Sequence, residues 1–253
     1  MWDQLGAIMG GFDPLVTVGL LLASFVASFI TVAFGIGGGA LLLAIMASLM
    51  PPAALIPVHG MVQLGSNLFR ALLLGLYVHW PPVLAFAVGT AVGVGLGGMV
   101  VINLPPAVVQ IGVGVFVIWS VLLRPPAWLS AQPLLTGTIS SFLTMFFGAT
   151  GVFVANFTKS LRLPRQEHVA THGTLMTLQH LLKVVAFGLL GFAFGPWLGF
   201  ILAMIVAGFL GTVTGRLLLT RMSDHGFKRA LDVILILVSL RLIWTGLGDW
   251  LGR

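Results

Sequence analysis

The chain has 253 residues, of which 58% are hydrophobic and only 7% are charged, with a net charge of +6 and no cysteine. A typical soluble domain carries about 25% charged residues, so this composition excludes an ordinary soluble enzyme and predicts a chain whose solvent is lipid. Disulfides are excluded, and the positive excess is first a topology signal rather than a sign of nucleic-acid binding. We therefore expect an all-α polytopic membrane protein with no nucleic-acid partner.

Apolar segments follow one another along the whole chain. In the first part we expect helices at about 14–34, 40–50, 53–78, 82–102 and 106–123. After a polar linker at 124–128, helices are expected at about 131–147, 152–161, 166–193, 196–218 and 229–247. A span needs about 20 apolar residues, so 40–50 and 152–161 are too short to cross a bilayer alone. This pattern predicts about 8 to 10 membrane helices.

Each short segment follows a glycine-containing break, at 35–39 and at 148–151. Backbone that leaves a helix inside a membrane must be buried in protein or line a wet cavity. The helices that restart at Ala40 and Val152 would present free N–H groups and a positive dipole end, which favour anions. The alternative is that glycine only lets helices pack closely. The first interpretation predicts a substrate site near the bilayer midplane, lined by Gly37, Gly38, Gly39, Thr150 and Gly151.

The two breaks belong to an internal repeat. A shift of 113 positions places Pro51 on Pro164, the pair His59-Gly60 on His172-Gly173, and Arg70 on Lys183, without a gap. A histidine–glycine pair, a proline and a basic residue rarely coincide by chance. We therefore expect two membrane repeats, residues 1–128 and 129–253, which together form one transport domain.

The orientation of the repeats follows from the number of segments. Five segments per repeat make the second repeat enter the membrane from the opposite side. If the Arg124 linker is cytoplasmic, the counted segments also place the other loop cations inside, as the positive-inside rule requires. The loops expected outside, near 50–52, 103–105 and 194–196, have no Lys or Arg. A parallel arrangement, with each broken pair as one long helix, stays open. The loop cations expected inside are Lys159, Arg162, Arg165, Arg216, Arg221, Lys228 and Arg229.

A polar stripe runs along one helix in each repeat. In the first repeat, the spacings of 4, 4 and 3 residues put four polar side chains on one helix face. The matching helix of the second repeat has a similar set, roughly on one face. Two repeated polar faces inside apolar segments predict a polar site between the helices. The stripes are His59, Gln63, Asn67 and Arg70 in the first repeat, and His172, Gln179, His180 and Lys183 in the second.

Arg70 and Lys183 are the costly members of these stripes. On insertion scales, placing an arginine or lysine at the centre of a membrane helix costs roughly 2.5–3.5 kcal/mol. Asp232 is the only acidic residue clearly within a predicted span, and Lys228 one turn away competes for it. A transported anion would be the missing counter-charge. The alternative is that both basic side chains reach back to the interface.

Histidines have two interpretations. His59, His172 and His180 could donate hydrogen bonds to an anion or bind a proton that travels with it, although a neutral histidine bonded to a helix carbonyl is the plainer alternative. His168 and His172, four residues apart and next to Glu167, could ligate a metal, but no third ligand is near in the sequence. We predict no metal, no cofactor and no catalytic residue.

The glycine motifs carry a resemblance to a known family. The run Phe34-Gly35-Ile36-Gly37-Gly38-Gly39, then Pro51-Pro52-Ala53 and a polar helix, resembles the sulfite exporter TauE/SafE family. The second half repeats it as 147–151, Pro164 and 170–172, with Thr150 and Val152 in place of two glycines. Arg70 and Lys183 are not a general feature of that family. The resemblance implies a multi-pass transporter of the bacterial inner membrane that exports sulfite, sulfoacetate or a related small anion.

The sequence thus predicts a secondary transporter of a small sulfur-containing anion, with co-transported protons as an option. A carrier of another anion or a cation is the first alternative, but cation sites in membranes usually need carboxylates, which are scarce here. An intramembrane enzyme is the second, and the chain lacks a cysteine nucleophile and clustered carboxylates. No phosphate-binding loop for ATP is present.

Overall fold

The computed structural model describes residues 11–34, 37–101, 105–123, 125–218 and 224–252, and these ranges contain ten α-helices and no strand. Three short 3-10 turns, at Gly75–Tyr77, Leu129–Ala131 and Gly195–Trp197, connect some of the helices. The helices are α2 (Pro14–Phe34), α3 (Gly38–Leu49), α4 (Pro52–Leu73), α5 (Val83–Val101), α6 (Pro106–Leu122), α7 (Pro133–Phe147), α8 (Gly151–Ser160), α9 (Arg165–Leu189), α10 (Leu198–Leu218) and α11 (Asp224–Trp250).

The distribution of side chains is the reverse of that in a soluble protein. Large apolar residues are exposed along the outer helices, among them Leu84 and Met99 on α5 and Leu22 on α2. Hydroxyl, amide, imidazole and ammonium groups are buried instead, including Thr144 and Lys183. Within the described residues, α2, α5, α10 and α11 each contain a stretch long and apolar enough to cross a bilayer. The outer surface is therefore suited to lipid, and the polar groups face the interior of the bundle.

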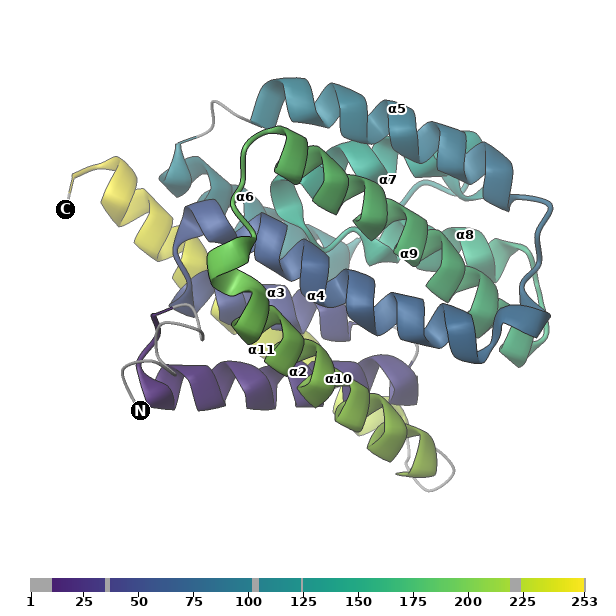
Figure 1. Cartoon of the computed structure of the whole chain (residues 1–253), viewed down its shortest axis with the longest axis horizontal. Helices are drawn as coiled ribbons and strands as arrows, with labels where there is room; N and C mark the ends of the chain where they lie inside the picture. The colour runs from purple at the N-terminus through teal and green to yellow at the C-terminus, as the bar shows by residue number, and fades with distance from the viewer. Residues whose placement is uncertain (1–10, 35–36, 102–104, 124, 219–223, 253) are drawn as a thin grey trace.

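The helices pack in four main pairs. Figure 1 shows α4 and α9 side by side through the middle of the bundle, with α5 and α7 on one side and α2 and α10 on the other. The fourth pair is α6 with α11. Glycines allow the close approaches: a Cβ at Gly93 would lie 2.8 Å from the backbone nitrogen of Phe142, so α5 and α7 meet almost backbone to backbone.

The close contacts also fix the helix directions. Gly89 of α5 faces Thr138 and Gly97 faces Met145, so α5 and α7 run parallel. In α10, Gly215 faces Phe29 of α2, and the Met204 carbonyl accepts a hydrogen bond of 2.7 Å from the Ser24 hydroxyl. The residue numbers of α2 and α10 rise together in these two contacts as well, so the two helices are parallel.

The central pair and the fourth pair run the other way. Gly60 of α4 faces Lys183 of α9, whereas Gly173 of α9 faces Arg70 of α4. In the fourth pair, Gly114 of α6 faces Ser239, and Gly246 of α11 faces Ala107. The residue numbers rise in one helix as they fall in the other, so α4 and α9 are antiparallel, and so are α6 and α11.

The sequence located the helices closely, and the differences lie at helix ends; α9, for example, ends at Leu189 rather than at the expected 193. The short helices begin at Gly38 and Gly151, up to two residues before the expected starts. Arg70 was expected well inside its segment but lies in the last turn of α4, which ends at Leu73. The final helix extends beyond the expected 229–247 at both ends.

Some predicted features fall outside the described residues. They are Gly35 and Ile36 of the first break, the loop at 102–104, the linker residue Arg124, and Arg221. The same holds for the side chains of Arg165, Arg216, Lys228 and Arg229. The assignment of these cations to the cytoplasmic side therefore stays a prediction.

Candidate functional site

The two glycine breaks interrupt the helices in different ways. At the first break, Gly37 has φ 105° and serves as the N-cap of α3. At the second, Gly148 has φ 70° and serves as the C-cap of α7. Both conformations strongly favour glycine, because a Cβ disfavours positive φ. Thr144 closes the second break, since its hydroxyl donates to the Gly148 carbonyl at 3.1 Å.

The polar face of α4 lies against the helix that follows the first break. The His59 ring nitrogen Nε2 is 3.1 Å from the carbonyl oxygen of Gly39 in α3, and the imidazole is fully buried. Gln63, one turn further along α4, also lies close to Gly39. A Cβ added to Gly39 would be 2.5 Å from the side-chain amide nitrogen of Gln63. Asn67 donates to the Gln63 carbonyl at 2.8 Å. The predicted stripe thus faces the interior and reaches the first break.

The polar face of α9 lies against the second break in a similar way. The Gln179 amide donates to the Thr150 hydroxyl at 2.7 Å and to the Ser140 carbonyl at 3.1 Å. The Lys183 ammonium lies 3.4 Å from the Thr144 hydroxyl. His172 approaches the backbone of Gly151 at the start of α8. Each polar helix therefore touches the broken helix of its own half of the chain.

The two polar faces meet each other along the α4–α9 contact. A Cβ at Gly60 would lie 2.6 Å from Cε of Lys183, and one at Gly173 would lie 3.4 Å from Cβ of Arg70. The absence of a side chain at both glycines brings the basic residues into the contact. The rings of His59 and His180 are 6.4 Å apart, edge to face. The polar seam, defined as His59, Gln63, Asn67, Arg70, His172, Gln179, His180 and Lys183, is thus one continuous cluster.

Both cations of the seam are buried without a carboxylate. Lys183 is 0% exposed and Arg70 is 9% exposed, so both side chains are enclosed by the helix bundle. The Arg70 guanidinium donates to the Ser66 hydroxyl at 3.2 Å, while its Nε has no partner. Within the described residues, neither cation forms an ion pair with Asp or Glu. A buried charge without a counter-charge is strongly destabilising, so buried cations are normally paired.

Several other polar atoms of the seam also lack partners. Both ring nitrogens of His180 are buried and unpaired, as are Nδ1 of His59 and the side-chain oxygen of Gln179. The hydroxyls of Ser140 and Ser141 on α7 are also buried without a hydrogen-bond partner. Buried polar groups are normally hydrogen-bonded, and a cluster of exceptions marks a place where a ligand or water supplies the missing bonds.

A family comparison bears directly on this cluster. The model of a family described as Sulfite exporter TauE/SafE matches residues 20–242. The chain belongs to the sulfite exporter TauE/SafE family. The match spans both glycine breaks and both polar helices, so the resemblance of the glycine motifs is confirmed. Neither curated proteins nor solved structures gave a match to the chain. Membership and the apolar spans make it a membrane transport protein of a family of sulfite exporters.

In the structure of this TauE/SafE protein, the predicted site residues fall into two groups. The stripe residues, with Gly39, Thr150 and Gly151, surround the α4–α9 contact. Gly37 and Gly38 face elsewhere: a Cβ at Gly37 would meet Leu231 of α11, and one at Gly38 would overlap the backbone of α2. At the first break, moreover, His59 meets a carbonyl of α3 rather than a free N–H group.

Sequence reasoning missed the contribution of α7 to the seam. Ser140, Ser141 and Thr144 are buried beside Gln179 and Lys183. Gln179 was predicted as part of the polar stripe, but its hydrogen bond to Thr150 at the second break was not. A signal was present, because Thr136, Ser140 and Thr144 recur every four residues in an otherwise apolar segment, and this spacing places them on one helix face.

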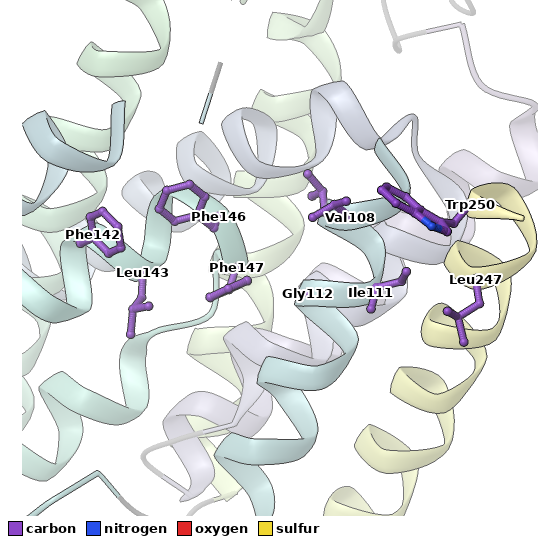
Figure 2. A pocket seen from close by; sticks show the side chains of 10 residues that line it. Val108, Ile111, Gly112, Phe142, Leu143, Phe146, Phe147, Leu247 and Trp250 are labelled. Atoms are coloured by element: carbon purple, nitrogen blue, oxygen red, sulfur yellow. The ribbon is translucent and has the colours of Figure 1, made fainter. Parts of the chain in front are cut away.

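A cavity with a wholly apolar lining lies apart from the polar seam. It measures about 540 Å³ and lies between α6, α7 and α11, as Figure 2 shows. Every lining residue is apolar or aromatic, and neither basic residue of the seam borders it. An anion would gain no counter-charge in this cavity.

Gln179 is expected to hold the second break in place. Replacing it with leucine removes both of its hydrogen bonds and leaves the buried Thr150 hydroxyl without its donor. An unsatisfied buried polar group costs about 1–3 kcal/mol, so Gln179→Leu should lower the midpoint of thermal unfolding in detergent by several degrees.

The matched control is Gln110→Leu in α6. Gln110 is also buried, but its side-chain oxygen has no partner. Its replacement by leucine removes an unsatisfied group and should leave the unfolding midpoint unchanged or raise it. Equal losses in both variants would contradict a specific role for Gln179 at the break.

Proposed function

We propose that this TauE/SafE protein is a secondary transporter that exports a small sulfur-containing anion, such as sulfite or a sulfonate, across the inner membrane of a bacterium. The substrate binds near the bilayer midplane, at the polar seam between α4 and α9. The observation that carries this proposal is the pair of buried cations, Arg70 and Lys183, with no carboxylate beside them among the described residues.

The helix pairs support an inverted repeat around that site. Under the 113-residue shift, α4 corresponds to α9, and α6 overlaps the first part of α11 over residues 224–235; each of these pairs is antiparallel. The same shift exchanges the parallel pair α5–α7 with the parallel pair α10–α2. Corresponding helices that run in opposite directions are what an inverted repeat requires, whereas a parallel repeat would align them. We propose residues 1–128 and 129–253 as these two repeats.

The side chains of the seam have distinct roles in this proposal. Arg70 and Lys183 neutralise the anion. The imidazoles of His59, His172 and His180, and the amides of Gln63 and Asn67, donate hydrogen bonds to its oxygens or carry a proton with it. The backbone at Gly39, Thr150 and Gly151 closes the ends of the seam.

Alternating access accounts for the closed state of the seam. His59, Gln179 and Lys183 are all fully buried, so an anion held here would be shielded from both sides of the membrane. One repeat moving against the other would open the α4–α9 contact to one side at a time. The positive-φ glycines Gly37 and Gly148 stand where the broken helices would bend.

Flux of labelled sulfite from proteoliposomes tests the proposal. Arg70→Gln should lower the rate at limiting sulfite at least about 30-fold, because removing one partner of a buried charge pair costs about 2–5 kcal/mol. Arg241→Gln is the control, since Arg241 is an exposed cation on α11 outside the seam. Sulfite flux no faster than from protein-free vesicles, or equal in wild type and Arg70→Gln, would refute the proposed function.

A further inference from the structure

The two cations of the polar seam approach it from opposite ends. Lys183 reaches in beside Gly60, near the first half of α4, and Arg70 lies in its last turn. Ten residues separate Gly60 from Arg70, which is about 15 Å of α-helix. The backbones of the two cations therefore lie at opposite ends of the seam. An anion bound between the two side chains would be attracted by both charges.

The charged ends come closer together than the backbones. Arg70 turns back along α4, because its guanidinium donates to the Ser66 hydroxyl four residues earlier. Lys183 has its Cε beside Gly60. Six residues separate Ser66 from Gly60, or about 9 Å along the helix axis. Two charge-assisted hydrogen bonds of about 2.8 Å, one on each side of a compact oxyanion, span most of that separation.

His180 lies between the two charges. It is within electrostatic reach of Lys183 and Arg70, and of His59 and His172. Both of its ring nitrogens are buried and unpaired, so it offers one donor and one acceptor to a ligand at this position. The seam therefore has cationic ends and a hydrogen-bonding centre, which fits a single compact anion.

The charge balance sets the valence of that anion. A singly charged ligand would neutralise one cation and leave the other buried without a counter-charge, which is the state that proteins avoid. Within the described part of the chain, no carboxylate pairs with either cation. Resting on the proposed function, we infer that the seam selects a doubly charged oxyanion of sulfur, held by Arg70 and Lys183 together with His180 between them.

A matched pair of ligands tests this inference on the purified full-length chain. Sulfate and methanesulfonate share a tetrahedral sulfur, but a methyl group replaces one charged oxygen in methanesulfonate. In competition against labelled sulfite, we expect sulfate and thiosulfate to compete at least 10-fold more strongly than methanesulfonate. Methanesulfonate competing as strongly as sulfate would overturn the inference and mean that Lys183 is neutral in the bound state.

Variants locate the preference in the seam. Lys183→Gln and Arg70→Gln should each weaken competition by sulfate and bring it level with that of methanesulfonate, while Lys183→Arg keeps the wild-type preference. An unaltered preference in both glutamine variants would overturn the inference. If either glutamine variant fails to fold, the wild-type comparison and Lys183→Arg still decide it. Absence of sulfite binding to the wild-type chain would instead refute the proposed function, and this inference with it.

Discussion

Ser66→Asp is expected to abolish sulfite transport while leaving the protein folded. Ser66 already accepts a hydrogen bond of 3.2 Å from the Arg70 guanidinium. An aspartate there would supply the counter-charge that Arg70 lacks, and it would repel an incoming anion. At an effective dielectric constant of 20, two like charges about 4 Å apart repel by about 4 kcal/mol, or roughly a thousand-fold in affinity. We therefore expect at least about 100-fold weaker sulfite binding.

The local structure has room for this change. Ser66 borders a small cavity of about 60 Å³ between α4 and α10, so the larger side chain need not displace a helix. Ser66→Asn is the control, because it has nearly the same shape without the charge. Thermal unfolding and calorimetric titration with sulfite measure the two effects separately. Sulfite binding retained in Ser66→Asp, or lost equally in Ser66→Asn, would contradict the role given to the unpaired Arg70.

The sequence predicts the helices well because hydrophobic length and glycine punctuation are local properties. The segment expected at 14–34 is α2 to the residue, and both short helices follow the predicted breaks. Helical periodicity also identifies the polar faces, since residues three and four apart share a face. His59 and Asn67 are buried on one face of α4, as that argument requires.

Periodicity cannot say what a face meets. The contact between α4 and α9 depends on Gly60 and Gly173, which admit Lys183 and Arg70 from the opposite helix. Nothing in the spacing of either stripe specifies that pairing. The hydroxyls of α7 were missed for the same reason. Ser140 and Thr144 belong to the seam only because Gln179 and Lys183 of α9 contact them in the folded protein.

The internal repeat also hides a difference between matched positions. Gly38 and Gly151 correspond under the 113-residue shift, and each begins a short helix. A Cβ at Gly38 would overlap the carbonyl oxygen of Ala27 and the hydroxyl of Thr31, both in α2. A Cβ at Gly151 would meet only the flexible end of Met176, at 3.5 Å. Equivalent glycines therefore have unequal packing constraints.

Gly38→Ala is accordingly expected to destabilise the protein strongly and to lower the yield of folded protein. Overpacking costs about 1–3 kcal/mol when side chains can yield, and more when a backbone carbonyl must move. Here α3 would have to separate from α2. Gly151→Ala should be close to neutral, because the added methyl group would make only an ordinary van der Waals contact with Met176.

The yield of monodisperse protein in detergent and the thermal unfolding midpoint would measure the contrast. Gly38→Ala should lower both sharply, and Gly151→Ala should change neither by much. Equal tolerance at the two positions would mean that α3 does not pack on α2 as closely as Gly38 indicates. Equal intolerance would mean that the second break cannot yield at Met176, and that α8 is held as tightly as α3.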